Sequence, residues 1–204
     1  MSESLKAQVA AVIGCGRDVE RAMAVGLAEA GAGIALATVD RSQEQDFGTN
    51  SIANEIWSIG REHFVRVMDA LDPTEVTAFA DEVWDRLGRC DLLVVNYDMV
   101  TTAPLLELSA DEWEHDLRFN LTGPFLAAQA FGRLMARQGS GRIALVSWQR
   151  EGADAAYVVA QAAKTAVVEQ LGRELGKAGV RIELVKGDGN AEMGLARRVV
   201  ASAG

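Results

Sequence analysis

The sequence contains few of the residues that mark secreted, membrane-spanning or disordered chains. Its two cysteines, Cys15 and Cys90, are too few for a disulfide framework and indicate a reducing compartment. Only 3 of the 204 residues are proline and 49% are hydrophobic, so extended disorder is not expected. The N-terminus lacks a basic segment followed by a long apolar run, and no apolar stretch reaches transmembrane length. These absences predict a cytoplasmic protein without a membrane span.

Positive charge and histidine are also scarce. The sequence has 20 Lys and Arg residues and 29 Asp and Glu residues. The resulting net charge of −9 argues against nucleic acid or an anionic membrane as the main partner. His63 and His115, the two histidines, lie far from other metal-ligating residues in the sequence, so no metal site is expected.

Short buried apolar runs alternate with longer amphipathic segments. The runs predict strands at 9–13, 34–37, 64–67, 92–95, 143–146 and 180–185. The segments between them predict helices at about 19–30, 50–60, 73–88, 109–137 and 154–178. Ser109 opens a capping box, and Gly31 and Gly179 are suited to end helices. The pattern predicts a single α/β domain over residues 1–204, a Rossmann-like doubly wound parallel sheet with helices on both faces.

The first predicted strand runs into a glycine-containing turn, residues 14–17, that opens a helix. Such a turn brings backbone N–H groups and a helix N-terminus to a pyrophosphate. Here Asp18 is expected to cap the helix and Glu20 to complement its dipole. Two carboxylates would then stand where an anion binds, and a like-charge pair at 4 Å costs about 4 kcal/mol at an effective dielectric of 20. Tight dinucleotide binding is not expected, although Arg17 and Arg21 could offset part of this cost.

Several motifs together resemble the short-chain dehydrogenase/reductase family over about residues 8–186. Gly14 matches the first glycine of Thr-Gly-x-x-x-Gly-x-Gly, Asn96 one asparagine of Asn-Asn-Ala-Gly, and Lys164 the catalytic lysine. The resemblance implies a Rossmann fold, NAD or NADP as cofactor, and a catalytic set of Asn, Ser, Tyr and Lys. The family continues with a substrate lid and a seventh strand, so the fold is expected to be shortened at its C-terminus.

The resemblance assigns catalytic roles to few residues. Asn120 falls on the family asparagine, and Lys164 on the lysine that holds the nicotinamide ribose and lowers the pKa of the tyrosine. The tyrosine position is Ala160, so the proton donor is missing. Tyr157 is a possible substitute, but it lies seven residues before Lys164, about 10 Å away along a helix, where the usual pair is about 6 Å apart.

The serine position has two candidates. Direct counting places Trp148 there, whereas counting back from Ala160 favours Ser147. Because a strand alternates its faces, only one of the two side chains points into the site.

The cofactor groove keeps part of the family pattern. If a dinucleotide binds, the candidate contacts are Gly14, Gly16, Arg17, Asp40, Asp69 and Asn96. The family's acidic position after the second strand falls on Thr38, and both Asp40 and Asp69 also suit ordinary turns. Tyr97 and Asp98 replace small residues after the fourth strand and would narrow and charge the adenine space.

The phosphate turn, the adenine pocket and the proton donor thus depart from the family pattern together. The leading prediction is a protein that has lost hydride transfer, needs no cofactor, and serves as a non-catalytic subunit in a homo-oligomer or with an active paralogue. The helices predicted at 109–137 and 154–178 would form the contact. One alternative is an active NAD(P)-dependent oxidoreductase acting on a carbonyl or alcohol with the remaining catalytic candidates. Another is a sensor for a small cationic or hydroxylated ligand.

Overall fold

Six parallel strands form one sheet at the centre of the molecule. The computed structural model describes residues 4–100, 102–150, 152–153, 155–188 and 197–201. The strands are β1 Val9–Gly14, β2 Gly33–Ala37, β3 His63–Arg66, β4 Leu92–Asn96, β5 Gly141–Gln149 and β6 Val180–Asp188. Their order is β3-β2-β1-β4-β5-β6, with every neighbouring pair parallel. The predicted strands are confirmed, with small shifts at their ends.

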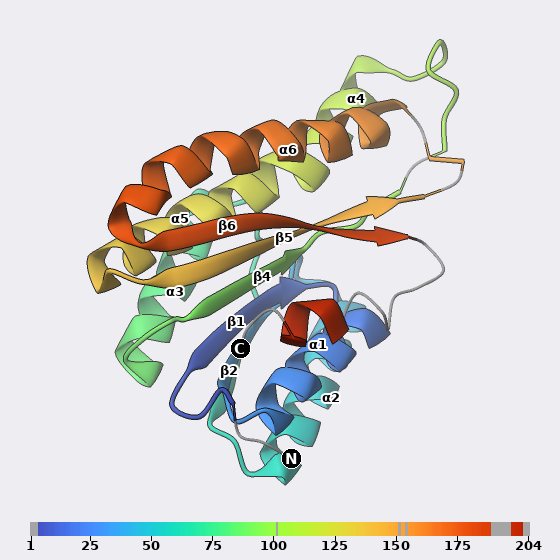
Figure 1. Cartoon of the computed structure of the whole chain (residues 1–204). Helices are drawn as coiled ribbons and strands as arrows, with labels where there is room; N and C mark the ends of the chain where they lie inside the picture. The colour runs from blue at the N-terminus through green and yellow to red at the C-terminus, as the bar shows by residue number, and fades with distance from the viewer. Residues whose placement is uncertain (1–3, 101, 151, 154, 189–196, 202–204) are drawn as a thin grey trace.

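Helices cover both faces of the sheet. They are α1 Asp18–Glu29, α2 Gln43–Ile59, α3 Pro73–Leu87, α4 Ala110–Leu117, α5 Gly123–Gln138 and α6 Ala155–Leu175. One apolar cluster packs α1 and α2 against the sheet, and a second packs α3, α5 and α6 against the opposite face (Figure 1). The predicted Rossmann-like fold is therefore confirmed.

Three local predictions differ from the structure. Asp18 is the first residue of α1 and Arg17 holds the N-cap position, so the prediction of Asp18 as the cap is wrong. Helix α2 begins seven residues earlier than predicted, because Ser42 Oγ accepts a hydrogen bond from the backbone N–H of Gln45 at 3.4 Å. The helix predicted at 109–137 is divided by a π-helical turn, Arg118–Thr122, between α4 and α5.

The strand order changes direction between β1 and β4, which places the candidate site. Gly14 is paired in register with Asn96, and Val95 with Leu145. The carboxyl ends of β1, β4 and β5 therefore meet at one edge of the sheet, where ligands bind in open α/β folds.

Residues 197–201 are helical and lie beside α1 (Figure 1). Val199 is fully buried, and Val200 packs near Gly26 of α1. No helix in the described ranges is long and apolar enough to cross a membrane.

Candidate functional site

A chain of hydrogen bonds crosses the carboxyl ends of β1, β4 and β5. Glu20, in the first turn of α1, accepts a hydrogen bond from the backbone N–H of Arg17 at 2.8 Å and another from the side-chain amide of Asn96. Asn96 Oδ1 in turn accepts from Trp148 Nε1 at 2.8 Å. Glu20, Asn96 and Trp148 are each at most 3% exposed. These bonds join the turn after β1 to β4 and β5.

Burial raises the pKa of Glu20, while the hydrogen bonds from Arg17 and Asn96 act in the opposite direction. The side chain of Glu20 lies directly over Gly14, where a Cβ atom would overlap the Glu20 Cγ. The absence of a side chain at position 14 therefore makes room for the carboxylate of the chain itself. Asp18, in the same turn of α1, has a side chain that is 95% exposed.

Helix α2 packs closely against the turn that follows β1. A Cβ at Gly16 would lie 2.9 Å from the backbone nitrogen of Thr49, and a Cβ at Gly48 would overlap the carbonyl oxygen of Gly16. The backbone of α2 thus lies in direct contact with the turn.

The ends of β2 and β3 are held by side chains of the protein. Gln45 Oε1 accepts hydrogen bonds from the backbone N–H groups of Val39 at 2.7 Å and Asp40 at 3.1 Å. Asp40 is exposed in the turn before α2. Asp69 Oδ1 accepts from the backbone N–H of Leu71 at 2.9 Å, which makes it a turn residue.

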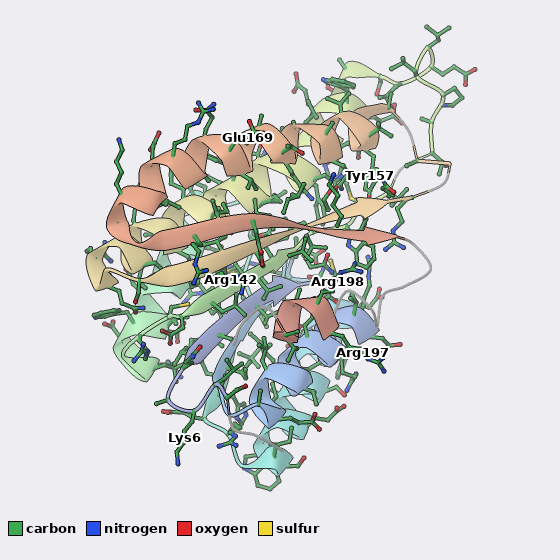
Figure 2. The ribbon with its side chains drawn as sticks, in the orientation of Figure 1. Lys6, Arg142, Tyr157, Glu169, Arg197 and Arg198 are labelled. Carbon is green, nitrogen blue, oxygen red and sulfur yellow. The ribbon has the colours of Figure 1, made fainter. Side chains whose placement is uncertain are left out.

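Asp98 lies just beyond β4 and is 4% exposed. Its carboxylate accepts a hydrogen bond from Tyr157 Oη at 2.6 Å and forms an ion pair with Arg150, whose Nε lies 3.1 Å away. Arg17 Nη1 donates to the Asp98 carbonyl oxygen at 3.3 Å. Burial, and next the hydrogen bond to Asp98, raise the pKa of Tyr157 well above its usual range. Tyr157, beside the carboxyl ends of the strands in Figure 2, therefore stays protonated and directs its proton at a carboxylate.

Lys164 is 1% exposed and donates its hydrogen bonds to the protein. Its Nζ lies 3.0 Å from the carbonyl oxygen of Val146 and 3.1 Å from Gln161 Oε1. Burial lowers the pKa of Lys164 to about 7, and the charge of Asp98 partly opposes that shift. Ala160, on the same helix, is fully buried and offers no proton.

The alternation of β5 distinguishes its two candidate side chains. Trp148 packs with Val146 on the face of the sheet that α1 and α2 cover, and its indole reaches Asn96. Ser147 lies two residues after Leu145 and therefore shares its face, which is the opposite one. The structure thus places an indole, rather than a hydroxyl, at the centre of the hydrogen-bonded chain. The guanidinium carbon of Arg150 lies 4.4 Å from the centre of the Trp148 ring.

The segment after β4 is held from the α5 side. Asn120, fully buried in the π-helical turn, donates to the Met99 carbonyl oxygen at 2.9 Å and accepts from its N–H at 3.2 Å. Tyr97 is fully buried, with its ring 5.9 Å from that of Phe119, and the missing side chain of Gly123 leaves it room. The bulk of Tyr97 is therefore accommodated in the core beside α5.

Two contributors were not among the sequence predictions. Gln161 bonds both Lys164 Nζ and, at 3.3 Å, the backbone N–H of Trp148. Its position three residues before Lys164 places both side chains on one helix face, which is a signal the sequence contains. Arg150, just past β5, could not be foreseen, because its partner Asp98 is 52 residues away in sequence.

Residues 8–191 match the protein family described as short chain dehydrogenase. The chain belongs to this family. It is 32% identical over 185 residues to D-threitol dehydrogenase of Mycolicibacterium smegmatis, a match that covers 89% of this chain and 69% of that protein. It is 26% identical over 181 residues, 87% of this chain and 71% of the relative, to (2S)-[(R)-hydroxy(phenyl)methyl]succinyl-CoA dehydrogenase subunit BbsD of Thauera aromatica. Among solved structures, a metagenomic short-chain oxidoreductase in complex with NADP has a TM-score of 0.87 and 28% identity, covering 98% of this chain and 91% of that one.

The residues of this member of the family do not fit a dinucleotide in the usual Rossmann position. The carboxylate of Glu20 lies over Gly14 and takes the N–H of Arg17, at the helix end where a pyrophosphate would bind. The backbone of α2 also packs directly against Gly16 in the same turn. Groups of the protein itself thus occupy the turn that would hold the phosphates.

Proposed function

We propose that this short-chain dehydrogenase family member does not transfer hydride itself and serves as a non-catalytic subunit that pairs with an active paralogue. One observation carries the proposal. The position of the family's proton donor is the buried Ala160, and the phenol of Tyr157 is hydrogen-bonded to Asp98 instead of lying free for a substrate.

The chemistry of proton transfer supports this proposal. A general acid needs a proton within reach of the reacting oxygen and a pKa near the working pH. The pKa of Tyr157 is raised rather than lowered, and Lys164, which lowers the tyrosine pKa in the family, bonds Val146 and Gln161. Among the residues that the structure describes, this site therefore offers neither an activated acid nor a lysine placed to activate one.

The outer face of α6 supports the assembly part of the proposal. Val158 and Val159 are 55% and 44% exposed, and the small side chains of Ala162 and Ala166 continue the same face. Helix α6 lies on the outside of its layer (Figure 1), with Glu169 pointing away from the sheet (Figure 2). Exposed apolar side chains on a small-residue helix face suit close helix packing between subunits. One relative carries the word subunit in its name, which is consistent with assembly of this kind.

The second candidate is an active NAD(P)-dependent oxidoreductase acting on a carbonyl or alcohol. The family relationship favours it, because the named relatives are dehydrogenases. Asp98 also links Tyr157 with Lys164, since it accepts a hydrogen bond from Tyr157 and its charge acts to raise the pKa of Lys164. In this case Tyr157 would be the only phenol in the cluster able to donate a proton.

Purification with and without a co-expressed active short-chain dehydrogenase from the same genome tests the proposal. We expect the chain alone to show no NADH- or NADPH-dependent reduction of carbonyl substrates, and to co-elute with the active protein. Tyr157→Phe and Lys164→Met should leave the activity of the mixed assembly unchanged. Turnover by the chain alone that is abolished by either substitution would establish the oxidoreductase instead.

A further inference from the structure

We propose that Glu20 is an internal replacement for a pyrophosphate, and that its side chain is the residue that keeps dinucleotides out of this member of the family. The inference concerns the groove alone and does not depend on pairing with a paralogue. The residues at the carboxyl ends of the strands do not fit the dinucleotide that the fold implies.

The carboxylate of Glu20 lies at the N-terminal end of α1. The first N–H groups of a helix have no partner within the helix, and an anion in a Rossmann fold binds there. Here Glu20 Oε2 accepts from the N–H of Arg17 at 2.8 Å. The carboxylate therefore takes a donor that a bound pyrophosphate would otherwise face.

The side chain of Glu20 is also buried. Glu20 is 3% exposed and fills the space over Gly14, whereas the side chain of Asp18 in the same turn is 95% exposed. Solvent weakens the repulsion between an exposed charge and an anion, whereas a buried side chain keeps filling the space it occupies. Glu20 thus blocks the turn by occupying it as well as by repelling an anion.

Side chains of β4 and β5 hold the carboxylate in place. Asn96 donates to Glu20 and accepts from Trp148 Nε1, so the carboxylate is connected to β5. The indole is held on two sides, by the guanidinium of Arg150 at 4.4 Å and by Gly187, where a Cβ would lie 2.6 Å from the ring. The Glu20 side chain is thus fixed in its position over the turn.

Replacing Glu20 with glycine, the residue that the family pattern has at this position, tests the inference. We expect wild-type protein to show no saturable change in nicotinamide fluorescence up to millimolar NADH. Glu20→Gly should bind NADH at least about tenfold more tightly, because the Arg17 N–H and the space over Gly14 become available.

Two matched variants separate occupancy from charge. Asp18→Ala removes one carboxylate from the same helix end without opening the groove, and Glu20→Gln removes the charge but keeps the bulk. Both should remain without NADH binding. Circular dichroism and thermal melting show whether each variant is folded. If glycine prevents folding, Glu20→Ala removes the carboxylate with a better helix former and is judged by the same criterion.

Three results would overturn the inference. The first is micromolar NADH binding by the wild-type chain, and the second is a pair of folded Glu20→Gly and Glu20→Ala proteins that gain no binding. The third is an equal gain in Asp18→Ala, since charge alone would then explain exclusion. Measurements of NADH binding and of turnover distinguish failure of this inference from failure of the proposed function. A Glu20 variant that binds NADH should still lack turnover because position 160 remains alanine.

Discussion

The burial of Lys164 is the clearest electrostatic feature of a single residue. An ammonium group removed from water loses solvation, and Val146 and Gln161 each supply only one hydrogen-bond acceptor. The pKa of Lys164 therefore falls to about 7, with burial as the main cause. The folded protein thus releases the proton of Lys164 near neutral pH, well below the pH at which an exposed lysine loses it.

Stability should depend on pH through this lysine. Above about pH 7 the folded state has released a proton that the unfolded state holds up to its pKa of about 10.4, so stability should rise with pH across that window, by at most about 1.4 kcal/mol per unit. Lys164→Met should remove this rise, so that the variant gains most relative to wild type at pH 6. Urea unfolding at several pH values measures the difference.

The exposed Lys177→Met variant is the matched control, and its difference from wild type should not change with pH. A Lys164→Met difference that is equally constant between pH 6 and 9 would contradict the assigned burial effect.

Trp148 provides a second test on a single residue. Trp148→Phe keeps an aromatic ring but leaves Asn96 Oδ1 without its donor in a buried site, which should cost about 1–3 kcal/mol in free energy of unfolding. Trp57→Phe, at a side chain that is 72% exposed, should have almost no effect. Denaturant titration compares them, and equal losses would show that the indole N–H contributes nothing specific.

At the scale of elements, the contact between α2 and the turn after β1 depends on two glycines. Gly48→Ala would place a Cβ against the carbonyl oxygen of Gly16, so α2 or the turn must move, at a cost of about 1–3 kcal/mol. Gly172→Ala, also within a helix, meets Ile182 only at 3.4 Å and should be neutral or stabilising by up to about 1 kcal/mol. Thermal melting of both variants tests the contact, and an unchanged Gly48→Ala protein would contradict it.

The elements were predictable because their signals are local. Buried strands such as β4 appear as continuous apolar runs, and the capping box at Ser109 marks the start of α4. The π-helical turn around Asn120 was missed, since it depends on hydrogen bonds to Met99 across the structure. The early start of α2 was also missed, because few apolar residues follow Ser42.

The site was predictable only as a set of residue identities. The sequence indicated Glu20, Asn96 and Trp148 separately, but not that Asn96 bonds both of the others. Partners 76 and 52 residues apart have no local signature that a single sequence contains. The same holds for Tyr157, whose bond to Asp98 spans 59 residues.

At the scale of the whole molecule, assembly through α6 is open to direct test. Val158→Asp places a charge on an exposed apolar face, so the monomer should fold normally while assembly weakens at least about tenfold. Size-exclusion chromatography with light scattering measures the change. Trp57→Asp, on the exposed face of α2, is the control and should leave the assembly intact. Equal behaviour of both variants and the wild type would exclude α6 from the interface.

Groups of the protein itself occupy the edge of the sheet at which a Rossmann fold holds a dinucleotide. Glu20 covers Gly14, α2 contacts Gly16, and Tyr157 is bound to Asp98. Calorimetric titration of the purified wild-type chain with NADH and NADPH tests this most directly. This occupancy predicts no saturable heat up to millimolar dinucleotide. Stoichiometric binding of either one in the micromolar range would contradict it.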